Sequence, residues 1–158
     1  MTDDIVQFCK SLFDLMRRFW SSFGHQMNGV LVRGGINVPQ YMALVALEEL
    51  GEATMGQLSK RLHVTMGAST NLVDKLIRGG YASRTRGLAD RRVVKVKLEA
   101  KGREILKEIE EKATSFMMGV LCDVEPERRK QFLESCTRMV AIAEAKETTE
   151  ALAGAKAG

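Results

Sequence analysis

The chain has 158 residues, is 45% hydrophobic and carries a formal net charge of +4. This length suits one domain, or a small domain with helical extensions, and the composition is ordinary for a globular protein. No run of the sequence approaches the roughly 18 to 20 apolar residues of a membrane span, and Asp3 and Asp4 are unlike the basic start of a signal region. We therefore expect a cytoplasmic protein that does not bind a membrane.

Cysteines and histidines are few and scattered along the chain. Cys9, Cys122 and Cys136 lie far apart, so neither a disulfide framework nor a CxxC metal site is indicated. His25 and His63 alone are too few for a histidine-rich metal site. The sequence has no glycine-rich phosphate loop and no Ser or Cys nucleophile beside a histidine, so we expect no catalytic residues, no metal and no cofactor.

Residues 3–33 predict one long amphipathic helix. Apolar residues recur at spacings of three and four, which places them on one stripe about eight turns long. Gly34 and Gly35 are typical of a helix end. So broad an apolar face exceeds what a small domain usually buries, so we expect a second chain to cover it. The stripe consists of Ile5, Phe8, Leu12, Met16, Phe19, Phe23, Met27 and Val30.

Three shorter helices are predicted next. The first begins near Pro39 and ends at Gly51, Thr54 can cap the second, and Thr65 can cap the third, which ends at Gly79–Gly80. Short helices in series, joined by short turns, are typical of a helix-turn-helix, whose last helix lies in the major groove of DNA. The predicted buried face of this recognition helix consists of Ser69, Leu72, Val73, Leu76 and Ile77.

A basic β-hairpin is predicted after the double glycine, where the hydrophobic period becomes two. Residues 81–86 form the first predicted strand, 87–90 the turn and 92–98 the second strand. Residues 60–97 contain ten Lys or Arg and two acidic residues, a net charge of +8, so the rest of the chain sums to −4. Such a segment is expected of a surface that neutralises phosphates, and a solvated charged face is the alternative.

Two more helices are predicted toward the C-terminus. The helical period returns from Lys101 to Leu121, and Pro126 opens another run through Ile142. Residues 147–158 are rich in Ala and Gly and lack an apolar stripe, so we expect a frayed tail. The predicted fold class is therefore mainly α with a small β-hairpin wing.

The outward face of the recognition helix carries candidate DNA contacts. Asn71 can pair in bidentate fashion with adenine, Thr70 can bond a base edge or a phosphate, and Met66 could touch a thymine methyl group. Lys75 and Arg78 are expected to meet phosphates. The alternative for each is an exposed side chain with no role in binding. The candidates on this helix are Thr65, Met66, Thr70, Asn71, Lys75 and Arg78.

The tip of the hairpin carries a second group of candidates. Arg84, Arg86, Arg91 and Arg92 flank a Gly-Leu-Ala-Asp turn that is too short and too polar to pack into a core. An arginine on such a projection suits a minor groove, most of all a narrow AT-rich one. Asp90 is placed to orient the Arg92 guanidinium through a charge-assisted hydrogen bond. The alternative is an ordinary charged turn.

The sequence resembles the MarR (multiple antibiotic resistance regulator) family of bacterial and archaeal repressors over residues 36–110. The resemblance rests on the stretches NVPQYMALVALEE, TMGQLSKRLHVTMGASTNLVDKLIRGGYASR and LADRRVVKVKLEAKGREIL. Its most specific pieces are LVDKL before Gly80-Tyr81, the Asp90-Arg91-Arg92 wing, and Leu98 followed by Lys101-Gly102-Arg103.

This resemblance implies a homodimer that binds double-stranded DNA. Residues 3–35 and 100–146 would interlock between two chains, and the two winged lobes, residues 36–99, would grip a pseudo-palindromic site. The family's wing pattern assigns the minor-groove arginine to Arg92 and its support to Asp90, which leaves Arg91 to a phosphate.

The start of the recognition helix departs from the family. Many relatives resemble Ser-Arg-Ser-Thr where this chain has Thr65-Met66-Gly67-Ala68. Base readout would then rest on Thr70, Asn71 and the shape of the DNA.

Members of this family commonly release DNA when a small phenolic or lipophilic compound binds between the dimerisation helices and the winged lobe, or when a cysteine oxidises. Cys9 lies near the position of the reactive thiol in peroxide-sensing members. Phe8 and Phe13 indicate an apolar surrounding for it, however, which favours an inert, packed thiol. We expect a repressor released by a small molecule; a redox sensor using Cys9 and a winged protein-interaction module that does not bind DNA are the alternatives.

Overall fold

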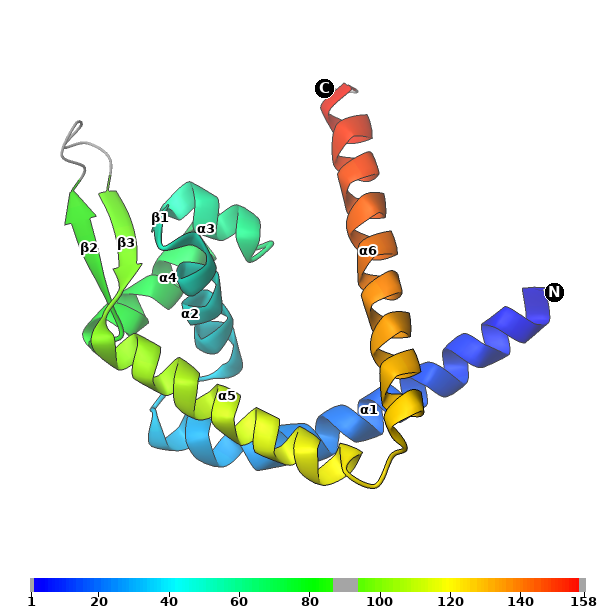
Figure 1. The fold of residues 1–158 in the computed structure, drawn as a ribbon. Helices are drawn as coiled ribbons and strands as arrows, with labels where there is room; N and C mark the ends of the chain where they lie inside the picture. The colour runs from blue at the N-terminus through cyan, green and yellow to red at the C-terminus, as the bar shows by residue number, and fades with distance from the viewer. Residues whose placement is uncertain (1, 87–93, 157–158) are drawn as a thin grey trace. The chain divides into compact units, whose positions relative to one another are not determined.

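The computed structural model describes residues 2–86 and 94–156. The predicted fold class, mainly α with a small β wing, is confirmed (Figure 1). Two compact units make up the chain, Met1–Phe116 and Met117–Gly158. The described elements are α1 (Thr2–Arg33), α2 (Val38–Leu50), β1 (Glu52–Thr54), α3 (Met55–Arg61), α4 (Met66–Arg78), β2 (Ala82–Arg86), β3 (Val94–Leu98), α5 (Ala100–Leu121) and α6 (Pro126–Lys156).

Helix α1 ends at the double glycine, as predicted. Gly35 has a φ of +61°, in the left-handed region that favours glycine. Its N–H donates to the carbonyl of Val32 over 3.0 Å, and the N–H of Ile36 donates to the carbonyl of Leu31 over 3.0 Å. These two bonds form a Schellman motif, which satisfies the last carbonyls of the helix.

Side-chain caps define the starts of the three short helices. Thr54 and Thr65 cap α3 and α4, as predicted, by accepting hydrogen bonds from the backbone N–H of residues 57 and 68. Asn37 caps α2 in the same way and forms a reciprocal capping box with Gln40. Each such cap satisfies a backbone donor that has no partner within the helix. The turn between α3 and α4 passes through His63, whose φ is +52°.

The wing is part of a three-stranded antiparallel sheet with the order β1-β3-β2. Strands β2 and β3 pair from Ala82↔Leu98 to Arg86↔Val94, so the predicted hairpin strands are confirmed within the described residues. The predicted turn at 87–90 and the first two residues of the strand predicted at 92–98 lie outside them. Strand β1 was not predicted, because three residues are too short to show a period of two.

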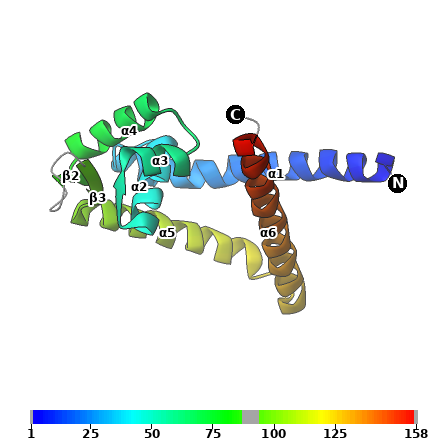
Figure 2. The same ribbon diagram turned by 90° about the horizontal axis from the view of Figure 1, so that it is seen from above.

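The core of the first unit lies beneath the helix-turn-helix. Leu44 and Leu47 of α2, Leu58 of α3 and Val96 of β3 have no exposed surface. Val30 of α1 joins the same cluster of buried side chains. Seen from above, α2, α3, α4 and the sheet gather where α1 ends and α5 begins (Figure 2). We call this group, residues 36–99, the winged lobe.

The second unit contains the end of α5 and helix α6. Helix α6 continues to Lys156, so the structure differs from the frayed tail expected from residue 147; residues 157–158 lie outside the described part. The reason is local: Ala, Glu and Lys are among the strongest helix formers, and they sustain a helix without an apolar stripe. Exposed apolar side chains in this unit are Met118, Val120, Phe132, Leu133, Met139, Val140 and Ile142.

Candidate nucleic-acid interface

Helix α4 divides into a buried and an exposed face. Ser69, Val73 and Leu76 have no exposed surface, and the remaining two members of the predicted stripe, Leu72 and Ile77, are half-buried. The predicted inward face is therefore confirmed. The opposite face exposes Met66, Gly67, Ala68, Asn71, Lys75 and Arg78.

Two of the predicted DNA contacts on α4 have structural partners within the helix. Thr65 Oγ1 accepts a hydrogen bond from the N–H of Ala68 over 3.2 Å, as its N-cap role requires. Thr70 is half-buried, and its Oγ1 donates to the carbonyl of Met66 over 2.8 Å. The Thr70 hydroxyl proton is thus engaged by the backbone, and only its oxygen lone pairs remain for a ligand.

Met66, at the start of α4, is partly exposed to solvent and partly in contact with α3. The side chain is 53% exposed, yet Ser59 Oγ of α3 donates to its sulfur over 3.3 Å. Ser59 itself is buried. The methionine therefore ties the first turn of α4 to α3, while part of its apolar surface stays open to solvent.

Arg84, predicted to contact DNA, is paired within the lobe. Its Nη2 lies 2.5 Å from Asp74 Oδ1 of α4, and the two side chains are 45% and 35% exposed. This ion pair joins the base of the wing to the recognition helix. The sequence does not reveal this pairing, because the partners are ten positions apart and lie on different elements.

The other wing candidates fall at or beyond the edge of the described structure. Arg86 is the last residue of β2 and pairs with Val94, the first residue of β3. Residues 87–93 lie between them in the sequence. Asp90, Arg91 and Arg92 lie in that segment, outside the described residues. Their roles therefore stay predictions.

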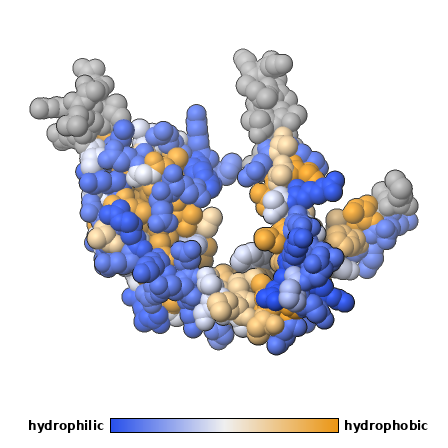
Figure 3. Space-filling model, viewed as in Figure 1, coloured by the Kyte–Doolittle hydropathy of each residue, from blue (hydrophilic) through white to orange (hydrophobic). Residues whose placement is uncertain are grey.

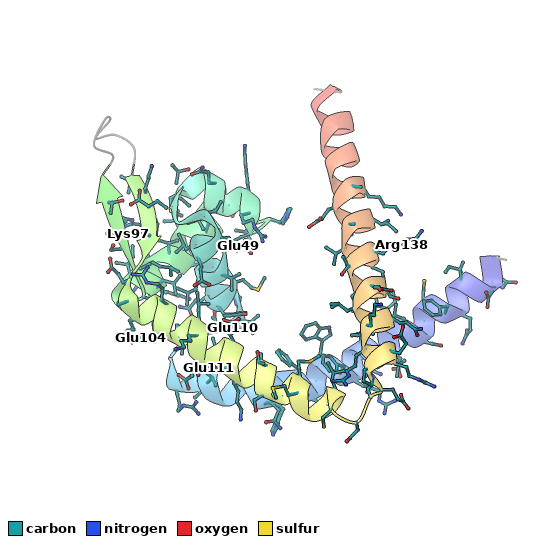
Figure 4. The ribbon with its side chains drawn as sticks, viewed as in Figure 1. Glu49, Lys97, Glu104, Glu110, Glu111 and Arg138 are labelled. Atoms are coloured by element: carbon teal, nitrogen blue, oxygen red, sulfur yellow. The ribbon has the colours of Figure 1, made fainter. Side chains whose placement is uncertain are left out.

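The excess of positive charge recognised in the sequence belongs to the winged lobe. Lys97 lies on β3, and Glu104, Glu110 and Glu111 lie along α5 (Figure 4). Lys95, also on β3, lies 3.8 Å from Glu52 of β1. Helix α5 carries four acidic and four basic residues, so it is neutral overall.

The comparisons with known proteins agree with this geometry. Residues 36–94 match the model of the MarR family. A solved structure of a MarR family protein from Bacillus stearothermophilus is 29% identical, with a TM-score of 0.74, over 88% of this chain and 96% of that one. The winged lobe of this chain belongs to the MarR family.

Two further relatives extend the comparison. YsmB of Bacillus subtilis, described as an uncharacterised HTH-type transcriptional regulator, is 32% identical over 88 residues, which are 56% of this chain and 60% of YsmB. The crystal structure of an S. aureus MepR-DNA complex has a TM-score of 0.67 at 18% identity and covers 82% of this chain and 97% of that one. At that identity the likeness to MepR concerns the fold.

The N-terminal half of α1 leaves its apolar side chains exposed. Phe8 is 60% exposed and Phe13 71%, and Figure 3 shows hydrophobic side chains at the surface there. Cys9, between them, is also exposed. The packed surrounding expected for this thiol is therefore absent from the described part of a single chain.

Further along α1, four aromatic rings pack together. Phe19 and Phe23 contact Phe116 of α5, with centroids 6.0 and 5.6 Å apart. Trp20 packs edge-on against Phe23 at 5.4 Å and remains 56% exposed. This cluster joins α1 to α5 in the first unit.

Two cavities border helix α2. One, of about 700 Å³, lies between α2 and α5. The other, of about 290 Å³, lies between α2 and the turn from α3 to α4, where Leu62, Val64 and Leu72 give it apolar walls. The first is lined by Tyr41, Val45, Glu48, Arg103, Leu106, Lys107 and Glu110.

Neither a metal cluster nor a single membrane-spanning helix is found in residues 2–86 and 94–156. No three His, Cys, Asp or Glu side chains there could hold a metal ion together. Helices α1 and α2 have the length and composition of a span only when taken as a pair, and that pair is bent by 80° at its break.

Proposed function

We propose that this protein is a homodimeric repressor that binds a pseudo-palindromic DNA site through α4 and the wing, and that a small molecule releases it. The observation that carries the proposal is the exposed face of α4, where polar and basic side chains stand on a helix that is otherwise buried in a winged helix-turn-helix. A helix in this position reads the major groove in other proteins of this architecture.

Asn71 is the main base-reading residue of this proposal. Its side chain is exposed near the middle of the outward face, and a carboxamide can donate to and accept from adenine at once. Lys75 and Arg78 follow on the same face and would meet phosphates, which position the helix without reading sequence. Thr70 would contribute as an acceptor, since its proton is bonded to Met66.

The wing would supply the second contact. Arg92 would enter the minor groove with Asp90 orienting it, and Arg86 and Arg91 would meet phosphates. Arg84 would act at the base of the wing, where its bond to Asp74 keeps β2 against α4. MepR, which shares this fold, has been crystallised with DNA.

The exposed face of α1 supports a homodimer. Ile5, Phe8, Phe13 and Leu15 are each more than half exposed within one chain. A terminal helix with such a face gains stability when a second apolar surface removes it from water. Dimerisation would also place two recognition helices on one DNA duplex, which a palindromic site requires.

The cavity between α2 and α5 supports release by a small molecule. Its volume, about 700 Å³, falls in the range of known ligand pockets. Tyr41 and Leu106 provide apolar contact, and Arg103 and Lys107 could hold a phenolate or carboxylate. A ligand there would contact both the lobe and α5, so it could change the angle between them. This function places the protein in the cytoplasm, with the DNA it binds.

The test is a gel-shift titration with a palindromic fragment from the region upstream of the gene. The wild type should bind it with nanomolar to micromolar affinity that falls steeply with salt, because bound lysines and arginines release counterions. Asn71→Ala and Arg92→Ala should each cost about 1 to 3 kcal/mol, which is roughly 5-fold to 150-fold in affinity.

Arg138→Ala is the matched control, since Arg138 is an exposed arginine on α6, outside the winged lobe (Figure 4). It should leave the affinity unchanged. Equal losses from Arg92→Ala and Arg138→Ala would show that only total charge matters and would overturn the wing assignment. Failure of the wild type to prefer any palindrome over random DNA would overturn the proposed function.

A further inference from the structure

Tyr81, just after the recognition helix, connects this helix to the end of α1 and to the start of α5. The residue is only 6% exposed. Its hydroxyl donates to the carbonyl oxygen of Gly34, directly after α1. Its own backbone carbonyl accepts from the N–H of Glu99, directly before α5, over 3.0 Å. A residue that follows α4 by three positions thus contacts the end of one long helix and the start of the other.

Lys101, in the first turn of α5, adds two contacts at the same place. Its Nζ lies 4.4 Å from the centroid of the Tyr81 ring, and it donates to the carbonyl of Gly79 over 2.8 Å. Gly79 is the C-cap of α4, so the ammonium group meets the negative end of the recognition helix. One cation therefore holds both the tyrosine ring and the last turn of α4.

Three glycines allow these segments to approach closely, and the approach is tightest at Gly102. A Cβ atom on Gly79 would lie 2.7 Å from Cδ2 of Tyr81, and one on Gly34 would lie 2.9 Å from Cδ1 of Ile105. A Cβ on Gly102 would overlap the carbonyl oxygen of Tyr81. Close packing of this kind leaves no room for the segments to slide past one another. We call Gly34, Gly79, Tyr81, Lys101 and Gly102 the Tyr81 junction.

Apolar packing also joins α1 and α5 to the winged lobe, but apolar contacts restrain the orientation of a helix less strictly than hydrogen bonds do. Val30, Ile105, Leu106 and Ile109 belong to the common core cluster. Burial of such side chains is non-directional. Hydrogen bonds from a fixed hydroxyl and a fixed ammonium to two helix-end carbonyls weaken steeply as their angles change. The polar contacts of the Tyr81 junction therefore add a directional restraint on α4 to the packing of its buried face.

We propose that Tyr81 and Lys101 are positioning residues that set the orientation of the recognition helix relative to α1 and α5, and thereby the half-site spacing that the dimer accepts. The inference rests on the proposed function, because it takes α1 and α5 as helices of the dimer and α4 as the DNA-reading helix. A change of α4 angle occurs twice in a two-fold dimer, once in each lobe, and so alters the distance between the two reading faces.

The experiment uses the full chain with Lys101→Met and Tyr81→Phe. Lys101→Met keeps the aliphatic stem and removes both contacts of the ammonium, and Tyr81→Phe removes one hydroxyl from a packed ring. Lys112→Met is the matched control: it removes the same charge from α5 at an exposed position outside the cavity between α2 and α5. Each protein is titrated with the palindromic fragment and with fragments carrying one base pair more or fewer between the half-sites.

One base pair changes the half-site separation by about 3.4 Å and also rotates one half-site about the axis. The wild type and Lys112→Met should strongly prefer one spacing. In Lys101→Met and Tyr81→Phe, affinity for that spacing should fall about tenfold, while affinity for the other spacings falls less, so that the preference shrinks. A loss of folded protein alone would weaken binding to all spacings equally. An unchanged spacing preference in both variants would overturn the proposal.

Amide hydrogen exchange provides a readout that does not depend on DNA. The N–H groups of Gly80 and Tyr81 donate to carbonyls of the last turn of α4, and they should exchange about tenfold faster in Lys101→Met than in Lys112→Met. Amides of α2 should exchange at the same rate in both. If the wild type binds no palindrome, the proposed function fails, and unchanged exchange at Gly80 and Tyr81 would then overturn the positioning role as well.

Discussion

Gly67→Ala is expected to stabilise the protein and to weaken DNA binding. Gly67 is the second residue of α4 and lies on its exposed face. A Cβ atom built there meets nothing within 4 Å, and its φ is not in the left-handed region. Nothing in the described chain therefore requires glycine at this position, although glycine lowers helix stability relative to alanine.

The two effects can be estimated separately. Replacing glycine by alanine inside a helix is worth about 0.5 to 1 kcal/mol, and the lower value applies near a helix end. For a protein of this size, 0.5 kcal/mol raises the melting temperature by about 1 to 2 °C. If this face lies against DNA, the added methyl group overpacks the contact and should cost about 1 to 3 kcal/mol of binding, or roughly 5-fold to 150-fold in affinity.

Gly56→Ala provides a closely matched control. Gly56 is also the second residue of its helix, and a Thr N-cap and a Met precede it just as they precede Gly67. A Cβ atom on Gly56 would meet only Thr54 Oγ1, at 3.9 Å. It should give a similar thermal gain and leave DNA affinity unchanged. Melting curves at fixed protein concentration and anisotropy titrations at fixed salt measure the two effects. Wild-type affinity in Gly67→Ala would show that the start of α4 does not approach DNA closely.

Three further outcomes are expected. Asp74→Asn should free Arg84 from its ion pair and make the slope of log affinity against log salt concentration steeper by about one, as for one more phosphate contact. Adding Arg84→Gln should restore the wild-type slope. A slope that is unchanged in Asp74→Asn would show that Arg84 does not contact a phosphate when it is released. Phe8→Glu places a charge at a position that is 60% exposed within one chain. It should shift the mass measured by light scattering from that of a dimer toward the 17.5 kDa of one chain. A dimer that stays intact would exclude this part of α1 from the interface. Leu76→Ala should lower the free energy of unfolding by about 2 to 5 kcal/mol because the side chain has no exposed surface; a loss no larger than that of Met118→Ala, at an exposed position, would contradict its place in the core.

Short-range signals predicted the elements of the winged lobe well. Thr54 and Thr65 are caps, and Gly34–Gly35 and Gly79–Gly80 end helices, as the sequence analysis expected. A cap or a Schellman motif involves residues only three to five positions apart, so its residue types are visible in the sequence. The same holds for the buried face of α4, which the helical period specifies.

Contacts between distant residues were not visible in this way. The partnership of Asp74 with Arg84 and of Lys101 with Gly79 depends on how β2 and α5 pack against α4. Strand β1 exists because Ala53 pairs with Val96 across more than forty residues. No periodicity within three residues could have indicated it.

The sequence by itself determined which segments are helices, where those of the winged lobe begin and end, and that positive charge gathers in this lobe, because these properties depend on neighbouring residues and on composition. The tertiary structure decided which of the charged and polar side chains remain free to contact a ligand. It engages the proton of Thr70 within α4, pairs Arg84 with Asp74, and uses Tyr81 and Lys101 to hold the recognition helix. Availability depends on packing across elements, and packing is a property of the folded chain.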